Sequence, residues 1–411
     1  MSWLDNGRIV GSAAALALPL AALAPLGLAP LLIAVGLAGL FVIVREAAWT
    51  EAFARPGAAL LAAVLAWALL SLWWSADQSH GGERWLRLTL ITICGLSLTA
   101  VADRLGANSR HLIKWTVIGG LVAGMAFLAF DFATDAWLRR LLRGAAAEEL
   151  SFGPSTLNRA GTVLVLLIWA PLACLWGSLR GLPAAALVGA CTLLLWRMES
   201  NAALLALALG VGVMAATAAA PRATTRVLAL VCATAILLAP VLPHTLIRPA
   251  AVIALAPGLA SPSVHRLYIW QFAAARIAAH PVRGWGFDAS RHVTGGDVPI
   301  GTENQALGAD YAGMTMMPLH PHNAVLQVWL ELGLPGGLLL AALCANLLLA
   351  IGRRSADRPA AAAAAAGVIT ALMVSGLSYG AWQNWWLATL WLAAAISLAI
   401  WRRDDDAEGP A

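Results

Sequence analysis

Residues 320–350 read HPHNAVLQVWLELGLPGGLLLAALCANLLLA, an apolar run that opens on two histidines and an asparagine. A helix needs about 20 apolar residues to cross the hydrocarbon core of a bilayer, and this run is long enough. Elsewhere the chain repeats the pattern, with apolar runs of roughly 17 to 22 residues separated by short polar segments. Because a helix satisfies its own backbone hydrogen bonds in lipid, the sequence predicts an all-α, polytopic membrane protein.

The composition agrees with a lipid environment. Of the 411 residues, 61% are hydrophobic and 11% are charged, whereas a soluble domain carries about 25% charged residues. The net charge of +5 is spread over many loops and does not indicate nucleic-acid binding. Neither a metal nor a cofactor is expected, because the cysteines lie scattered in the apolar runs and the predicted periplasmic loops hold no Asp-x-Asp pair.

About twelve transmembrane helices are predicted from the apolar runs. They lie near residues 9–25, 28–44, 58–74, 86–102, 112–130, 159–178, 182–197, 202–219, 225–242, 322–350, 360–380 and 384–401. The chain therefore divides into residues 1–242 with the first nine spans, a long loop at 243–321, spans ten to twelve at 322–401, and a tail at 402–411.

Basic residues gather in alternate loops, which predicts the orientation in the membrane. These loops hold Arg45, Arg55, Arg104, Arg110, Lys114, Arg180, Arg222, Arg226, Arg353, Arg354, Arg358, Arg402 and Arg403. The positive-inside rule makes them cytoplasmic. An even number of spans then places both termini in the cytoplasm and loop 243–321 on the opposite face, which in a bacterium is the periplasmic face of the inner membrane.

The long loop contains the best candidates for binding an anion. Residues 264–279 are expected to form an amphipathic helix, with Arg266 near its start and Trp270 one turn later on the same face. The planar guanidinium fork suits phosphate oxygens. We therefore expect Arg266 to bind a diphosphate, with Arg283 and Arg291 as further candidates.

The loop also contains a turn and leads into the tenth span. His280-Pro281 is expected to end the amphipathic helix, and Gly284-Trp285-Gly286-Phe287 to form a tight aromatic turn. Further on, the group Gly333, Gly336 and Gly337 allows close helix approach, and Pro335 permits a kink.

His322 is the candidate base. Pro321 fits the first turn of a helix, which predicts that His322 and Asn323 lie in the first turn of span ten at the membrane surface. The positive end of the helix dipole favours a nearby anion and biases the imidazole towards its neutral form, which accepts protons. The alternative interpretation of His322 is a capping or interfacial histidine.

The motif order resembles the O-antigen ligase/polymerase family of membrane proteins. The order is Arg, Trp and His-Pro-x-x-Gly-x-Gly in a long loop, then His322-Asn323, nine residues, and Gly333-x-x-Gly336. The resemblance covers nearly the whole chain. It implies a GT-C-like membrane fold and a metal-independent, inverting glycosyltransferase. Such a ligase moves a glycan from undecaprenyl diphosphate to lipid A–core at the periplasmic face, with His322 as base and Arg266 holding the diphosphate.

In one place the sequence departs from the family pattern. The resemblance leads us to expect an arginine in a Ser-Arg-x-Ala context at a mid-chain span, but residues 200–203 read Ser-Asn-Ala-Ala. Arg159 and Arg197 are the candidates to supply this charge. The predicted substrate-binding residues are therefore Asn323, Arg283, Arg291, Arg159, Arg197 and Trp270.

Three other functions are alternatives to the ligase. A polymerase of the same family would use another lipid-linked glycan, rather than lipid A–core, as acceptor. A transporter would need charged or broken helices near the membrane midplane, where the sequence has almost no charge. A scaffold would not need His322 and Arg266.

Overall fold

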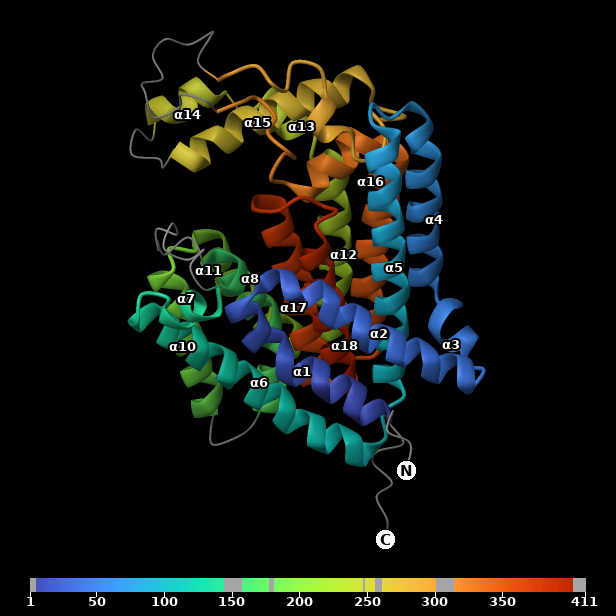
Figure 1. The fold of residues 1–411 in the computed structure, drawn as a ribbon, viewed down its shortest axis with the longest axis vertical. Coiled ribbons are helices and arrows are strands. Elements are labelled where there is room, and N and C mark those ends of the chain that lie inside the picture. The colour runs from blue at the N-terminus through green and yellow to red at the C-terminus, as the bar shows by residue number, and fades with distance from the viewer. Residues whose placement is uncertain are drawn as a thin grey trace.

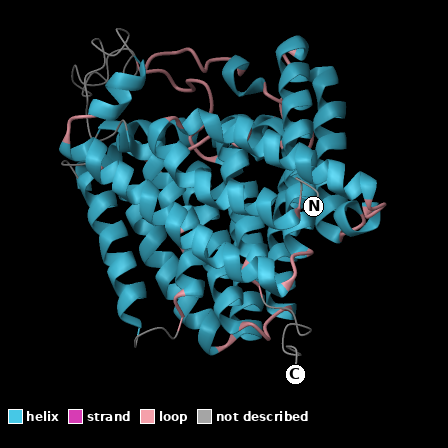
Figure 2. Ribbon diagram, turned by 60° about the horizontal axis from the view of Figure 1, so that its bottom comes forward, coloured by secondary structure: helices cyan, strands magenta, loops and turns pink. Residues whose placement is uncertain are grey.

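A computed structural model describes residues 5–143, 157–176, 181–246, 248–255, 261–300 and 314–401. Within these ranges the chain is helical and has no strand, apart from an isolated antiparallel bridge between Pro299 and Thr315 (Figure 2). The predicted all-α fold is confirmed. The predicted tail at 402–411 lies outside the described residues.

Nine helical segments of the described chain are long and apolar enough to cross a membrane. Their helices are α1 (Asn6–Leu23), α2 (Leu28–Arg45), α4 (Pro56–Ser71), α5 (Gln78–Asp103), α6 (Ala107–Ala133), α11 (Asn201–Ala219), α12 (Pro221–Leu238), α16 (Ala324–Arg353) and α17 (Arg358–Leu377). Shorter apolar helices occupy the three other predicted spans: α8 (Asn158–Leu167) with α9 (Trp169–Cys174), α10 (Leu182–Arg197) and α18 (Asn384–Ala399). The polytopic architecture is confirmed, and the number of spans stays a prediction.

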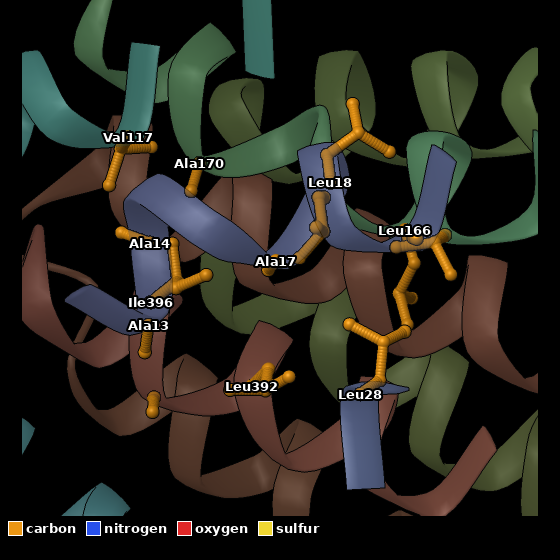
Figure 3. Close-up of a cluster of buried hydrophobic side chains, with 14 of the residues drawn as sticks. Ala13, Ala14, Ala17, Leu18, Leu28, Val117, Leu166, Ala170, Leu392 and Ile396 are labelled. Atoms are coloured by element: carbon orange, nitrogen blue, oxygen red, sulfur yellow. The ribbon is translucent and has the colours of Figure 1, made fainter. Parts of the chain in front are cut away.

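Small residues bring the helices into close contact. A Cβ added at Gly120 of α6 would lie 2.4 Å from the carbonyl oxygen of Ala14 in α1, and one at Gly36 of α2 would lie 2.4 Å from Cys94 Cβ in α5. Such approach is typical of membrane helices, which gain contact through small residues. The largest core cluster shares this packing, as Figure 3 illustrates with Ala13, Ala14, Ala17, Leu18, Leu28, Val117, Leu166, Ala170, Leu392 and Ile396.

Several arginines of the predicted cytoplasmic loops meet at one end of the bundle. Asp103 Oδ2 lies 2.9 Å from Arg55 Nη2, and Asp103 Oδ1 lies 3.0 Å from Arg354 Nη1 at the end of α16. Close by in the sequence, Arg104 pairs with Glu46 at 2.7 Å. Since His322 precedes the start of α16, it lies at the opposite end of the same helix.

The long loop crosses this opposite end (Figure 1). It contains α13 (Val241–Thr245), α14 (Pro249–Leu255), α15 (Ser261–Ala279) and a 3-10 turn, η6 (Ala289–His292). Helix α15 is the predicted amphipathic helix, and it ends at Ala279 as expected. Further short helices complete the described chain: η1 (Pro25–Gly27), α3 (Trp49–Phe53), η2 (Leu72–Trp74) and α7 (Trp137–Arg143).

Candidate active site

Helix α16 begins later than the sequence predicts. Its first residue is Ala324, and Asn323 is the N-cap, with its Oδ1 accepting a hydrogen bond from the Leu326 amide at 3.0 Å. The placement of His322 and Asn323 in the first helical turn is therefore wrong. The physical reason is that an asparagine side chain caps a helix best from just outside it. His322 has a φ of 53°, a left-handed conformation that is uncommon for residues other than glycine.

The hydrogen bond of the His322 ring defines its tautomer. Nδ1 lies 3.1 Å from the carbonyl oxygen of Ser378, which can only accept, so Nδ1 carries the proton. The lone pair is then on Nε2, and a neutral imidazole in this state can accept a proton there. The strained backbone and the carbonyl together fix the orientation of the ring.

Burial lowers the pKa of His322 below its ordinary value of 6.5. The Ser378 carbonyl opposes this shift, while the nearby charges of Arg266 and His265 reinforce it. Desolvation disfavours the charged imidazolium, and so do neighbouring cations. His322 is therefore neutral near pH 7.

We expect the rate of the reaction to report this lowered pKa. If neutral His322 is the base, kcat/KM stays constant as the pH falls to about 6.5 and declines only below it, because protonation removes the Nε2 lone pair. The measurement is kcat/KM between pH 4.5 and 8 in detergent-purified protein. A half-maximal rate at pH 7 or above would contradict the assignment.

A second histidine supports the first. His320 Nδ1 accepts the backbone N–H of His322 at 3.1 Å, and the two rings lie 4.5 Å apart. His320 Nε2 must then carry a proton, and it lies 3.0 Å from the side-chain amide of Gln383. Turning that amide would let its otherwise unpartnered oxygen accept the Nε2 proton of His320. Burial, followed by His322 and the charges of Arg84 and Arg291, lowers the pKa of His320 to about 4, so it stays neutral.

Helix α15 brings Arg266 and Trp270 to His322. The Trp270 indole donates a hydrogen bond to the carbonyl of Pro321 at 3.0 Å. Arg266 is partly buried, and burial lowers the pKa of its guanidinium. Arg266 lies close enough to His322 and to Tyr379 for its charge to act on both side chains. The structure thus places a positive charge within electrostatic range of the neutral imidazole of His322.

Arg159 joins the same neighbourhood from α8. Its Cζ lies 5.8 Å from the ring centre of Trp385, and the Trp385 ring contacts Tyr379 edge-on at 4.8 Å. Tyr379 interacts electrostatically with both Arg159 and Arg266, and its hydroxyl lies 3.1 Å from Thr162 Oγ1. Tyr379 therefore lies within reach of two cations that come from different parts of the chain.

The other arginine candidates lie further from this neighbourhood. The Arg197 guanidinium stacks over Phe132 of α6 at 4.9 Å. Arg283 is exposed, and within the described chain no contact joins it to His322 or Arg266. Arg291, in η6, interacts electrostatically with His320 and Asp288, on the side of the histidine pair where Arg84 also lies. The described residues contain no cluster of three or more metal-ligating side chains.

The glycine-rich turn of the loop docks on a break in α16. Gly333 has φ 62°, which interrupts the helix two residues before Pro335. The turn donates two hydrogen bonds to the helix at this point, from the Trp285 amide to the Leu330 carbonyl at 2.8 Å and from the Gly286 amide to the Glu331 carbonyl at 2.9 Å. The kink predicted in this helix is confirmed, and it lies at the glycine rather than at the proline.

Both glycines at this contact are required by space as well as by conformation. Gly284 has φ 67°, and a Cβ there would lie 2.4 Å from the Glu331 carbonyl oxygen. A Cβ at Gly333 would lie 2.2 Å from the carbonyl oxygen of Val282. The His-Pro-x-x-Gly-x-Gly and Gly-x-x-Gly motifs, recognised separately in the sequence, therefore form one interface, more than two helical turns along α16 from His322.

The sequence analysis missed three residues of this region. Glu331 carried a signal, because an ionisable residue inside an apolar run marks a functional position by default. Tyr379 is one of only three tyrosines in the chain, but nothing in its surroundings marks it. Ser378 contributes a backbone carbonyl, which leaves no signal in the sequence.

Comparison with known proteins agrees with the motifs. Residues 162–341 match the sequence model of a family described as O-Antigen ligase, a range that reaches from α8 into α16 and includes Arg266 and His322. Three similar proteins from Rickettsia all bear the name "Putative polysaccharide ligase".

The relatives differ in how much of their length is matched. The protein from Rickettsia prowazekii is 33% identical over 141 residues, 34% of this chain and 33% of the relative, so this match spans a third of that protein. The protein from Rickettsia typhi is 26% identical over 70% of this chain and 68% of the relative. The protein from Rickettsia conorii is 24% identical over 82% and 78% respectively.

Proposed function

We propose that this chain, which resembles the O-antigen ligase family, transfers a glycan from undecaprenyl diphosphate to lipid A–core. The reaction takes place at the periplasmic face of a bacterial inner membrane, with both termini in the cytoplasm. The observation that carries this proposal is the neutral His322, held by the Ser378 carbonyl beside Arg266. The ligase names of the relatives support the reaction class.

The chemistry needs one proton acceptor and one site for a leaving anion. Nε2 of His322 takes the proton of an acceptor hydroxyl, and the hydroxyl oxygen forms a bond to the anomeric carbon of the donor sugar. The bond from that carbon to the diphosphate oxygen breaks on the opposite face, which inverts the configuration. The diphosphate keeps the electron pair, and cations stabilise the charge as it develops.

Two arginines of this site suit the leaving diphosphate. Arg266 approaches from α15 and Arg159 from α8, and both interact with Tyr379. A guanidinium presents its donors in a fork that matches two phosphate oxygens at once. We propose that Arg266 binds the diphosphate and that Arg159 supplies the charge that residue 201 lacks. Trp270 and Asn323 hold the segment around His322, and Arg291 acts electrostatically on His320.

Deleting the gene in its host tests the proposed function directly. The lipopolysaccharide is separated on a gel, and the deletion strain is complemented with the wild-type protein. A bare core with accumulating long lipid-linked chains supports the ligase. A core that carries single repeat units without long chains makes the protein a polymerase and overturns the proposed acceptor. An unchanged glycan profile overturns glycan transfer altogether.

Replacing Arg266 by lysine is expected to lower kcat/KM for the donor about tenfold or more, since a charge-assisted hydrogen bond contributes about 1.5–3 kcal/mol. Lysine keeps the positive charge but lacks the planar guanidinium group that can donate two hydrogen bonds to the phosphate oxygens at once. The matched control is Arg276→Lys on the same helix, where the guanidinium stacks over Phe272 at 4.9 Å. Transfer assays with both variants should separate them, and equal rates would contradict a diphosphate role for Arg266.

A further inference from the structure

Glu331 is a fully buried carboxyl group, 0% exposed, within the apolar run of α16. Four groups donate hydrogen bonds to it: Gln327 Nε2 at 2.9 Å, Trp382 Nε1 at 2.6 Å, the Asp288 amide at 2.8 Å, and Ser290 Oγ. The donors come from α16, from the loop after α15 and from the segment 378–383 between α17 and α18. The Glu331 side chain therefore joins α16, the loop after α15 and the segment 378–383.

We propose that Glu331 is a positioning residue for His322, acting through Gln327 and the segment 378–383. The proposal rests on the proposed function of His322 as base. A chain of two hydrogen bonds, here called the relay, connects Glu331 to this segment. Glu331 Oε1 accepts a hydrogen bond from Gln327 Nε2, and Gln327 Oε1 accepts one from the backbone amide of Ala381 at 2.8 Å. Segment 378–383 then presents the Ser378 carbonyl to His322 Nδ1 at 3.1 Å.

The segment 378–383 is hydrogen-bonded at three points. Ala381, near its middle, contacts Gln327, and its two end residues contact the two histidines. Ser378 binds His322, and Gln383 binds His320. The backbone passes closely between the two groups at Gly380, where a Cβ would lie 2.9 Å from the His320 ring and 3.0 Å from Gln327 Oε1. A change at Gln327 therefore reaches both histidines through a short, packed path.

The donors at Glu331 define which atoms must accept. The Trp382 indole and the Asp288 amide are obligatory donors, so Oε2 has to accept from both. Gln327 has one oxygen and one NH₂ group, and its oxygen is taken by the Ala381 amide. Its NH₂ group therefore needs an acceptor at Oε1 of Glu331.

The test is the isosteric Glu331→Gln. The new amide oxygen must face Trp382 and Asp288, so its NH₂ group replaces Oε1 and meets the NH₂ group of Gln327. If Gln327 turns to avoid this, it presents a donor to the Ala381 amide. We expect kcat to fall about tenfold, the effect of one unsatisfied buried donor, with an unchanged KM for the donor.

A pH measurement separates positioning from a merely structural role. The Ser378 carbonyl raises the pKa of His322, so loosening this contact moves the acid limb of kcat/KM to lower pH. Gln327→Met removes the side chain at the centre of the relay and is expected to move the acid limb to lower pH by the same amount. The double variant, Glu331→Gln with Gln327→Met, is expected to show no larger shift. The matched control is Ser71→Ala in α4, which removes the acceptor of the Phe287 amide of the same loop and a hydrogen bond to Ala68 within its own helix, and leaves the contacts of Glu331 in place. It is expected to keep the wild-type pH profile.

Labelling of His322 by diethyl pyrocarbonate, followed by mass spectrometry across pH, reports its protonation without any transfer reaction. A lower midpoint in Glu331→Gln than in wild type supports the relay even if the chain transfers no glycan, which would refute the proposed function alone. Equal midpoints, or an activity loss that only follows the loss of folded protein, overturn the positioning role.

Discussion

Replacing His322 by alanine is expected to slow glycan transfer by about 10²–10⁴-fold, the usual contribution of a general base. The variant loses the Nε2 lone pair that we propose takes the proton of the acceptor hydroxyl. Its fold should persist, because among the described residues the ring makes a single hydrogen bond, to the Ser378 carbonyl. The measurement is transfer by purified protein with a lipid-diphosphate donor, with thermal unfolding as a check of the fold.

Two further variants sharpen this result. His322→Gln can still donate to the Ser378 carbonyl but cannot take a proton at neutral pH, so it should be as slow as alanine. The matched control is His244→Ala in α13, an exposed histidine of the same long loop, which should transfer at the wild-type rate. A His322→Ala protein with near wild-type activity would place the base elsewhere.

The second large effect is expected at the contact between the glycine turn and α16. Gly284→Ala forces a residue with a side chain into φ 67° and puts its Cβ 2.4 Å from the Glu331 carbonyl oxygen. The left-handed conformation costs about 1–2 kcal/mol, and overpacking costs about 1–3 kcal/mol more. We expect a markedly lower unfolding temperature in detergent and a loss of activity.

The control for this variant is Gly82→Ala in α5, where an added Cβ meets nothing within 4 Å. It should unfold at the wild-type temperature or slightly above, because alanine favours a helix by roughly 0.5–1 kcal/mol. Gly333→Ala should resemble Gly284→Ala, and the double variant should lose less than the sum, since both changes break one interface. If Gly284→Ala unfolds like wild type, this interface does not hold the loop in place.

The sequence predicted the helices well, because long apolar runs leave the chain few alternatives in lipid. It was less accurate where local capping decides the boundary. Pro321 indicated a helix start, but the side chain of Asn323 caps α16 one residue before Ala324 and leaves His322 outside. The amphipathic pattern of residues 264–279, by contrast, predicted α15 closely, because a periodic face is a feature of the sequence itself.

The site was predictable only in part, because its contacts join helices that are distant in the chain. Sequence spacing alone could not show whether Arg159 or Arg197 lies near Arg266, because the answer depends on which helix end faces α15. The structure places Arg159 beside Trp385 and Tyr379, and Arg197 over Phe132. The partner of the His322 ring is a backbone carbonyl, which any residue at position 378 would supply.

The segment 378–383 has a consequence for the order in which the protein is made. It lies between the last two helices of the described chain, whereas α15 and His322 precede it. During synthesis, His322 reaches its side of the membrane before its carbonyl partner and the Gln383 amide exist. The nascent protein can bury most of its described helices while the His322 ring still lacks the carbonyl that orients it. The orientation of His322, and with it the activity that we propose, is therefore completed late, with the insertion of α17 and α18.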